Sequence, residues 1–501
     1  MRDLTAIAAV LFLLPGSFAL QKHLQGNDCC NVLREAGVGN IFLPQSKNYT
    51  ERVHSYWSLT SQLEPNCFVL PGNAEEVSTI VKTLVEKTKC EFAVRSGGHS
   101  SNAGYNNILN GVTIDLSRIN STTYNNATQI ASVGPGARWL GVYRTMDALD
   151  RGIQGGAIGT VGVGGLLLGG GFANYAYQRG LATDDIVNFE VVLANGSIVQ
   201  ANATHNQDLW RTLKGGGSGF GIVTRYDMYT FERPLMWSSY REFSASEELD
   251  EAHIRGLKHW TDNEEAYKSG AAYVWWTYRP ADNDTILIAM VGDTSGQANP
   301  PAAQEFLNIS GAKTESGGLT NMSQEALATQ AEGYRNIWWT LTLKNEEHAI
   351  RKAVHLHHQL VSEMLRDSVN LDFETQAYFQ PLPIIMAQRA AEKGGNTLGL
   401  DRIGNNSVIL LASLAVNGVD QEALGRQKMY AWLRALEQYT EATGTMVEYK
   451  YMNYADATQD VLKSYGRENV KRMQRVSSKY DPEGVFQTRA PGGFKLPWGF
   501  E

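Results

Sequence analysis

The chain has 501 residues, 43% of them hydrophobic, which is enough to bury a sizeable core and to form two or three domains. Its 44 lysines and arginines are outnumbered by 52 aspartates and glutamates, giving a net charge of -8 and no basic surplus for nucleic-acid phosphates. We therefore expect a globular protein with no nucleic-acid partner.

The N-terminus has the order of a secretory signal peptide. Arg2 precedes an apolar run from Ala6 to Leu14, and Ser17-Phe-Ala19 forms a small-x-small cleavage site. The run is too short to cross a bilayer, and no later stretch approaches the roughly 20 apolar residues of a membrane helix. We expect residues 1–19 to be a signal peptide, with a buried N-terminal helix as the alternative, and no membrane anchor.

Glycosylation motifs support a secreted or secretory-pathway lumenal protein. The Asn-x-Ser/Thr sites begin at Asn48, Asn120, Asn126, Asn195, Asn202, Asn283, Asn308, Asn321 and Asn405. Any one site arises by chance, but nine together with a signal peptide indicate a glycoprotein.

All four cysteines lie in the first fifth of the chain, at Cys29, Cys30, Cys67 and Cys90. In an oxidising compartment they predict one or two disulfides that join the N-terminal segment to the next domain. The preferred pair is Cys67 with either Cys29 or Cys30. A zinc site is the weaker interpretation, because no second CxxC-like pair or nearby histidine pair accompanies them, so no metal is expected.

The region from Asn73 to Leu116 predicts a helix, a strand, a glycine loop and a second strand. Apolar residues recur at helical spacing from Val77 to Val85, and Asn73 is a suitable N-cap. Strands are expected at 91–95 and 112–116, with the loop RSGGHSSNAGY between them. In this loop a histidine is surrounded by small residues, which leaves room for a ligand.

Two further glycine clusters follow, at 152–171 and 214–224, the second running into an alternating strand from Tyr226 to Phe231. Such glycine density weakens any regular element, but it lets backbone N–H groups approach a phosphate closely. A flexible linker is disfavoured by the accompanying Val, Leu and Ile. A nicotinamide-binding Rossmann site is disfavoured because no GxGxxG lies between a strand and a helix with an acidic residue about 20 positions on.

After Arg233-Pro the composition changes from glycine to aromatic and charged residues. We expect a separate α+β domain, with a strand at Tyr273–Tyr278 and a helix from Glu422 to Glu437. Its tryptophan pairs, Trp275-Trp276 and Trp338-Trp339, can serve as core or as aromatic surface for a ligand. The C-terminal part predicts a strand at Tyr449–Tyr454, then a helix, and a closing loop through Phe486.

Five motifs in this order, RSGGHS, TVGVGGLLLGGG, KGGGSGFGIVT, YMNY and KYDPEGVF, resemble the secreted FAD-linked oxidoreductases related to berberine bridge enzyme. That group belongs to the vanillyl-alcohol oxidase superfamily, and the resemblance covers roughly residues 60–490. It implies an α+β fold: a two-subdomain PCMH-type FAD-binding domain at 61–235, a substrate domain with an antiparallel sheet at 236–440, and a C-terminal segment at 441–501 that returns to the FAD domain. Residues 20–60 form the N-terminal segment.

The resemblance identifies the cofactor as FAD and implies a covalent bond from His99 to the flavin 8α-methyl carbon. The alternative is a loop histidine that is not bonded to the flavin. Some family members have a second tether through a cysteine, but Ile158 stands at that position here, so no second link is expected.

The remaining cofactor contacts are carried over residue by residue from the same motifs. The implied cofactor-binding residues are Arg95, Ser96, Gly97, Gly98, Ser100, Asp115, Gly159, Thr160, Val161, Gly162, Gly165, Gly216, Gly221, Val223 and Asn453. Leu166 stands where many relatives have histidine, so a polar contact from that side chain to the ribityl chain is not expected.

Flavin oxidation needs hydride delivery to the flavin and a base that takes the hydroxyl proton. Tyr451 and Tyr454 reproduce the family's YxxY spacing, and Tyr454 is preferred as the catalytic residue, with Tyr451 second. In a strand the two side chains would point to opposite faces, so only one would meet the substrate. The resemblance also implies that Val161, a small residue, leaves O2 a path to the flavin.

The resulting hypothesis is an oxidase acting on a small hydrophobic alcohol or related natural-product intermediate, with O2 as acceptor and H2O2 as product. Carbohydrate oxidation is the alternative within the enzyme class, since tryptophans also stack on sugars. A binding protein that retains FAD as structure is the alternative outside it.

Overall fold

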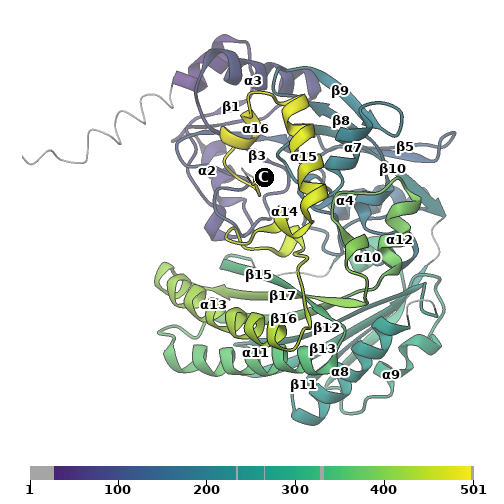
Figure 1. The fold of residues 1–501 in the computed structure, drawn as a ribbon. Coiled ribbons are helices and arrows are strands. Elements are labelled where there is room, and N and C mark those ends of the chain that lie inside the picture. The colour runs from purple at the N-terminus through teal and green to yellow at the C-terminus, as the bar shows by residue number, and fades with distance from the viewer. Residues whose placement is uncertain (1–27, 233–234, 264–265, 328–331, 498–501) are drawn as a thin grey trace, which may run out of the picture.

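The computed structural model describes residues 28–497 except 233–234, 264–265 and 328–331. The expected signal peptide lies outside the described residues. Three sheets organise the chain: two small sheets in its first half and one large antiparallel sheet in its second half. The long helices of the second half cover one face of the large sheet, and its other face is turned toward the small sheets (Figure 1).

The first sheet has four strands in the order β1-β2-β4-β3, and β2 and β3 both run parallel to β4. Its elements are β1 (Ile41–Phe42), α2 (Lys47–His54), β2 (Cys67–Val69), α3 (Ala74–Lys87), β3 (Phe92–Arg95) and β4 (Val112–Asp115). The predicted helix and both predicted strands are confirmed. Asn73 caps α3 by accepting a hydrogen bond from the Glu76 N–H.

The second sheet has the order β5-β6-β10-β8-β9, with β7 paired to the far end of β10. Its elements are β5 (Thr122–Asn125), β6 (Ile130–Val133), α4 (Trp139–Asp147), β7 (Arg151–Ile153), α5 (Val163–Leu168), α6 (Ala176–Arg179), β8 (Ile186–Val192), β9 (Ile198–Asn202), α7 (Gln207–Leu213) and β10 (Ile222–Glu232). The glycine cluster at 152–171 thus forms regular structure only in β7 and in the short helix α5. The predicted strand at 226–231 lies within β10.

The third sheet has the order β14-β11-β13-β12-β16-β17-β15-β18. Its strands are β11 (Met236–Ser244), β12 (Gly270–Arg279), β13 (Asp284–Asp293), β14 (Thr314–Thr320), β15 (Arg335–Lys344), β16 (Phe373–Leu382), β17 (Ser407–Val416) and β18 (Met446–Val447). The helices of this half are α8 (Glu247–Asp262), α9 (Gln304–Leu307), α10 (Met322–Glu325), α11 (Glu347–Asp367), α12 (Ile385–Glu392) and α13 (Val419–Ala442). The predicted strand and helix of this region are both confirmed, in β12 and α13.

Alternation along the third sheet separates a core face from an open face. Trp276 is buried and donates its ring N–H to Asp250 of α8, and the buried His357 of α11 hydrogen-bonds Thr375 on β16. Their strand neighbours Trp275 and Tyr378 therefore point away from the helices and lie on the open face. Trp276 therefore belongs to the core, whereas Trp275 is half-buried on the open face.

The C-terminal segment crosses back to the first two sheets (Figure 1) through α14 (Val461–Ser464), α15 (Arg467–Tyr480) and α16 (Val485–Thr488). Here the predicted strand at 449–454 is wrong. The chain forms a 3₁₀ turn at Met452–Tyr454, in which the Tyr454 N–H donates to the Tyr451 carbonyl oxygen. The predicted helix is confirmed in α15.

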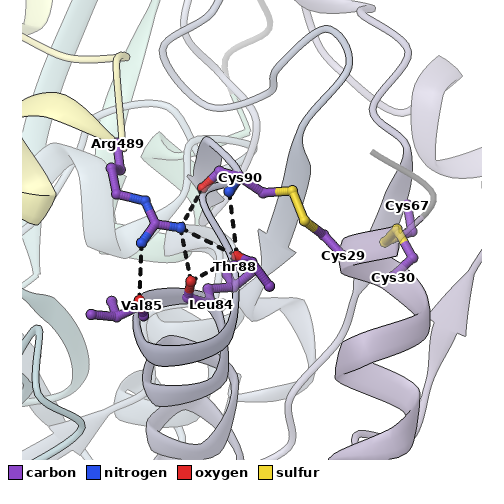
Figure 2. Close-up of a disulfide and its surroundings, with 8 residues drawn as sticks. All are labelled: Cys29, Cys30, Cys67, Leu84, Val85, Thr88, Cys90 and Arg489. Atoms are coloured by element: carbon purple, nitrogen blue, oxygen red, sulfur yellow. Dashed lines mark hydrogen bonds between the residues drawn. A yellow bond between two sulfur atoms is a disulfide. The ribbon is translucent and has the colours of Figure 1, made fainter. Parts of the chain in front are cut away.

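Two disulfides tie the N-terminal segment to the first sheet, Cys30–Cys67 and Cys29–Cys90. The first resolves the open choice of partner for Cys67. Figure 2 shows that the second lies beside Arg489, whose guanidinium group donates to the carbonyl oxygens of Leu84 and Cys90. The two ends of the described chain therefore meet at the link between α3 and β3.

Candidate active site

The loop RSGGHS begins at the end of β3 on a buried network of charges. Arg95 is 1% exposed, and its guanidinium group donates to the carbonyl oxygens of Arg52 and Ser55 at the end of α2. Asp115, at the end of β4, accepts hydrogen bonds from Arg52 at 2.9 Å and from the Ser117 N–H at 3.0 Å. These hydrogen bonds hold the first residues of the loop in place.

The loop itself presents unused backbone donors. Among the described residues, no backbone N–H from Gly97 to Ser101 donates a hydrogen bond, and Gly98 has a φ of 73°. Successive free N–H groups around a left-handed glycine form a concave anion-binding surface. This donor set fits a phosphate or diphosphate group.

The second glycine cluster packs directly against this loop. A Cβ on Gly162 would lie 2.6 Å from the Cα of Gly97 and 2.8 Å from the Ser96 hydroxyl oxygen. The hydroxyl of Ser96 also accepts the Gly164 N–H at 3.1 Å. Glycine is therefore required where the two loops cross, because a side chain would push them apart.

Arg138, at the start of α4, joins the two loops. Its guanidinium group donates to the carbonyl oxygen of Gly97 at 2.8 Å and to that of Thr160. Burial lowers the pKa of Arg138, and the nearby positive charges of Arg95 and Arg52 lower it further. The three arginines line a cavity of about 510 Å³ beside the loop, together with Ser96 and Ser117.

The cation excess of this cavity also suits an anionic ligand. Neither Arg52 nor Arg138 was among the predicted site residues. Arg138 follows the sequence VGPGA at the end of β6, but nothing in its local pattern signals that it reaches the histidine loop.

His99 occupies the far end of the loop and is held by an aromatic ring. Its imidazole stacks on Trp57 with ring centroids 4.4 Å apart and planes 8° from parallel. Burial lowers the pKa of His99 to about 4, and its Nε2 atom is buried with no hydrogen-bond partner among the described residues. A neutral imidazole with a free ring nitrogen fits covalent attachment to an electrophilic carbon, which requires an unprotonated nitrogen.

A chain of ring contacts connects His99 with the tyrosine pair. Trp57 meets Trp338 of β15 at 5.3 Å, Trp338 meets Tyr454 at 5.9 Å, and Tyr454 meets Tyr451 at 4.8 Å. The structure thus brings together residues from opposite ends of the sequence. Of these, Trp338 was predicted only as core or general aromatic surface.

The tyrosines do not point to opposite faces, because they lie in a turn and their rings touch. Tyr451 is 2% exposed, and its hydroxyl accepts hydrogen bonds from the Phe172 N–H at 2.9 Å and from the Asn453 amide at 3.1 Å. The same amide donates to the carbonyl oxygen of Leu166. Burial raises the pKa of Tyr451 to about 12, against the lowering effect of the Asn453 bond.

Tyr454 is half-buried, whereas Tyr451 is buried. Burial raises the pKa of Tyr454 well above its ordinary value of 10, and the nearby Tyr451 and Tyr273 raise it further. Tyr454 therefore has the more accessible hydroxyl, whereas Tyr451 is fixed by three elements of the fold.

The other predicted cofactor residues are spread around these groups. The Gly159 N–H donates to the carbonyl oxygen of Ala326, while Val161 is partly buried against the core. Gly165 is exposed, and the position that a Cβ would take there has no atom within 4 Å, so it faces open space. Gly216, Gly221 and Val223 are buried where α7 leads into β10.

The open face of the third sheet lies across from the tyrosine pair. It carries Trp275 and Tyr378, whose rings are 5.5 Å apart, and Tyr273, which donates to Asn174 at 2.7 Å. Strand alternation adds Gln376 and Gln380 to the same face. This surface is aromatic and amide-bearing near Tyr454.

The fold and the site together fit a flavoprotein, with a glycine-lined loop and a buried histidine in one half and an aromatic sheet face in the other. A family profile described as FAD binding domain matches residues 65–202, and one described as berberine and berberine like matches residues 450–491. The chain belongs to the berberine bridge enzyme-like family of FAD-dependent oxidoreductases.

Two relatives at the sequence level are fungal proteins. The chain is 35% identical to the FAD-dependent monooxygenase drtC of Aspergillus calidoustus, over 96% of this chain and 92% of that one. It is also 35% identical to the FAD-dependent monooxygenase sdcF of Emericella nidulans, over 93% and 98% of the two chains.

Solved structures share the fold at lower identity. Wild-type BBE-like 1 of Physcomitrella patens matches with a TM-score of 0.74 at 18% identity, over 94% of this chain and 100% of that one. Xylooligosaccharide oxidase from Myceliophthora thermophila, in complex with xylobiose, matches with a TM-score of 0.73 at 22% identity, over 94% and 100% of the chains. Among the described residues, none of the helices is both long and apolar enough to span a bilayer.

Proposed function

We propose that the protein is an FAD-dependent oxidase that acts on a small, uncharged hydrophobic alcohol or a related natural-product intermediate. The observation that carries this proposal is the aromatic and amide-bearing sheet face across from Tyr454, connected by ring contacts to His99. When bound, FAD supplies a two-electron acceptor for the hydride of the substrate C–H bond.

In this proposal His99 tethers the cofactor, the N–H groups from Gly97 to Ser101 hold its diphosphate, and Arg138 keeps the two glycine loops together. Tyr454 hydrogen-bonds the substrate hydroxyl and takes its proton. Because burial raises the pKa of Tyr454, its phenolate form needs a hydrogen-bond donor when the proton transfers. Tyr451 and Asn453 position the turn that carries Tyr454.

The first experiment is acid precipitation of the chain expressed in a glycosylating host, with His99→Ala as the matched variant. We expect yellow, fluorescent flavin in the washed wild-type pellet and none in the variant pellet. A colourless pellet from a yellow native protein would show that His99 binds FAD without a covalent bond. A native protein without flavin would refute the proposed cofactor altogether.

A second candidate reaction has a specific support, since both fungal relatives described above are called monooxygenases. The fate of O2 separates the two reactions. An oxidase converts each oxidised alcohol and one O2 to a carbonyl product and one H2O2, with no oxygen from ¹⁸O2 in the product. Substrate-dependent ¹⁸O incorporation instead of stoichiometric peroxide would favour the monooxygenase.

Sugar oxidation stays a further alternative, because partly buried tryptophans such as Trp275 and Trp338 can also stack on a pyranose ring. Peroxide release with a panel of aryl alcohols and oligosaccharides, compared at equal concentration, distinguishes these substrates. Turnover of only the oligosaccharides would refute the hydrophobic-substrate proposal.

Access of O2 is assigned to Val161 in the same proposal. Val161→Ile adds one methylene group beside the glycine loop, and we expect it to slow reoxidation by air of the photoreduced enzyme. An unchanged reoxidation rate would remove Val161 from this role.

The two disulfides and the glycosylation motifs support a secreted or secretory-pathway location. We also infer that residues 61–235 form the FAD-binding domain and residues 236–440 the substrate domain. Residues 441–501 then form the returning segment, which contributes β18 to the edge of the third sheet next to β15.

A further inference from the structure

Trp57 lies flat against His99, the residue proposed to carry the flavin. The ring centroids are 4.4 Å apart and the ring planes are 8° from parallel. Both residues are half-buried, so the indole covers one face of the imidazole while part of the histidine stays open to a ligand. Trp57 was not among the predicted site residues, because it lies outside the glycine motifs.

The backbone around Trp57 is bonded to the histidine loop. Residues 55–61 lie between α2 and β2, and the Trp57 N–H donates to the carbonyl oxygen of Gly98 at 3.2 Å. Two hydroxyl groups of this segment donate to the next carbonyl oxygens of the loop, Ser61 to Ser100 at 2.8 Å and Thr60 to Ser101 at 2.6 Å. The segments that carry the indole and the imidazole can therefore move apart only by breaking these three hydrogen bonds.

The third sheet holds the same segment from the other side. The Ser58 hydroxyl oxygen accepts the N–H of Asn336, at the start of β15, at 3.1 Å. The Trp57 ring also makes a T-shaped contact with Trp338 of the same strand, with centroids 5.3 Å apart. The plane of the Trp57 ring is thus set by contacts that do not involve His99.

A flat neighbour matters for a histidine that has to form a covalent bond. The lone pair of a ring nitrogen lies in the plane of the imidazole, so the bond forms in the direction in which the ring edge points. The histidine side chain itself restricts rotation of its ring only weakly. A parallel indole at 4.4 Å restricts this rotation, because turning would drive the imidazole edge into the indole face. Small errors in the position of reacting groups cost up to about 100-fold in rate.

We propose that Trp57 is a positioning residue for the cofactor, whose indole holds the His99 ring in the plane from which one ring nitrogen bonds the flavin 8α carbon. The proposal rests on the covalent tether proposed above. In this step one N–C bond forms, and the imidazole N–H bond and one 8α C–H bond break. The two protons and two electrons that are released pass to the flavin and then to O2, which leaves as H2O2. Trp57 exchanges no atom or electron.

The first test compares side chains of different shape at position 57. Trp57→Leu keeps an apolar group without a flat face, and Trp57→Phe restores a flat ring. The matched control is Trp339→Leu, because Trp339 is also half-buried but packs against Tyr430 of α13, away from His99. Each protein is expressed in the glycosylating host, and its total flavin and the share of flavin released by acid are measured.

We expect acid to release little flavin from wild type and from Trp339→Leu. In Trp57→Leu the released share should rise about tenfold or more at unchanged total flavin, and Trp57→Phe should bring it most of the way back. If Trp57→Leu does not fold, Trp57→Met gives the same comparison with a more adaptable side chain.

Three results of this test would overturn the proposal. The first is a wild-type released share in Trp57→Leu. The second is a folded Trp57→Leu protein that binds no flavin, because a positioning residue acts on bound cofactor. The third is a released share in Trp57→Phe as high as in Trp57→Leu, because the flat face would then not be the feature that matters.

The second test reads the stacking itself and does not depend on flavin. Histidine is labelled with ¹³C at Cε1, and the His99 resonance is identified by its loss in His99→Ala. A ring stacked face to face shields this group, so we expect the His99 proton resonance to move downfield in Trp57→Leu and to stay in place in Trp339→Leu. An unmoved resonance in Trp57→Leu would refute the ring contact on which the proposal depends.

Failure of this inference can be told from failure of the proposed function. If the wild-type pellet is colourless although the native protein is yellow, the tether is refuted and the positioning role with it. If the wild-type and Trp57→Leu pellets are equally coloured, only the positioning role is refuted. If the preparation contains no flavin, the proposed cofactor and the positioning role are both refuted, whereas the His99 resonance still reports the ring contact.

Discussion

Replacement of Gly162 by alanine tests the crossing of the two glycine loops. Gly162 has φ −75° and ψ 147°, a conformation open to any residue, so alanine carries no backbone penalty there. Its Cβ would lie 2.6 Å from the Cα of Gly97, a backbone atom that cannot move away by changing a rotamer. Overpacking of this kind costs about 1–3 kcal/mol, and we expect the upper end.

The comparison variant is Gly165→Ala, in the following helix α5, where no atom lies within 4 Å of the added carbon. In a helix this change raises stability by up to about 1 kcal/mol. Thermal unfolding and the flavin-to-protein ratio are measured for both variants. We expect Gly162→Ala to lose melting temperature and flavin, and Gly165→Ala to keep or raise its melting temperature but to lose flavin if its open space holds the cofactor. A Gly162→Ala protein with wild-type melting temperature and flavin content would refute the steric reasoning.

Three other changes have defined outcomes. Burial lowers the pKa of His253 to about 4 from 6.5, so its contribution to stability is complete above pH 6.5 and is lost as the pH falls toward 4. In urea unfolding, His253→Gln should reduce the loss of stability over that pH window by at most about 3 kcal/mol. If the variant loses as much stability as wild type between pH 6.5 and 4, His253 is not the cause of the loss. The double variant Cys29→Ser with Cys90→Ser removes a disulfide between residues 61 positions apart, and it should lower the free energy of unfolding by about 2–4 kcal/mol. Thermal unfolding measures this loss, and a wild-type melting temperature would show that the disulfide does not stabilise the protein. Arg138→Met removes both hydrogen bonds from this side chain to the glycine loops and should lower the flavin content of the purified protein. Full flavin loading of the variant would refute the proposal that Arg138 keeps the two loops together for flavin binding.

Short-range sequence patterns predicted α3, β3 and β4, the elements on either side of the loop RSGGHS. Asn73 and the apolar spacing after it determine α3, because a capping side chain and one apolar face act within a few residues. The two strands flanking RSGGHS are likewise short runs bounded by turn residues. The expected fold class and the cofactor followed from five motifs whose order was visible in the sequence.

Contacts between distant segments were not predictable in the same way. A strand was predicted at Tyr449–Tyr454, but the Lys450 N–H donates to the Ser464 hydroxyl and the Tyr451 hydroxyl accepts the Phe172 N–H, so the chain turns there. Arg138 and Gln380 lie near the glycine loops and the tyrosine pair only because the fold brings the start of α4 and the open face of the third sheet there. Neither residue belongs to a local motif, so sequence spacing alone did not single them out.

The meeting of the chain ends has a consequence for the order of biosynthesis. The Phe92 N–H donates to the carbonyl oxygen of Arg489 at 2.8 Å, and the Asn102 amide donates to that of Ala455 at 2.9 Å. Both strand β3 and the histidine loop thus receive partners from residues that a ribosome adds hundreds of codons later. These two hydrogen bonds can therefore form only after the C-terminal residues have been synthesised, so the first sheet and the histidine loop reach their final contacts after translation has ended.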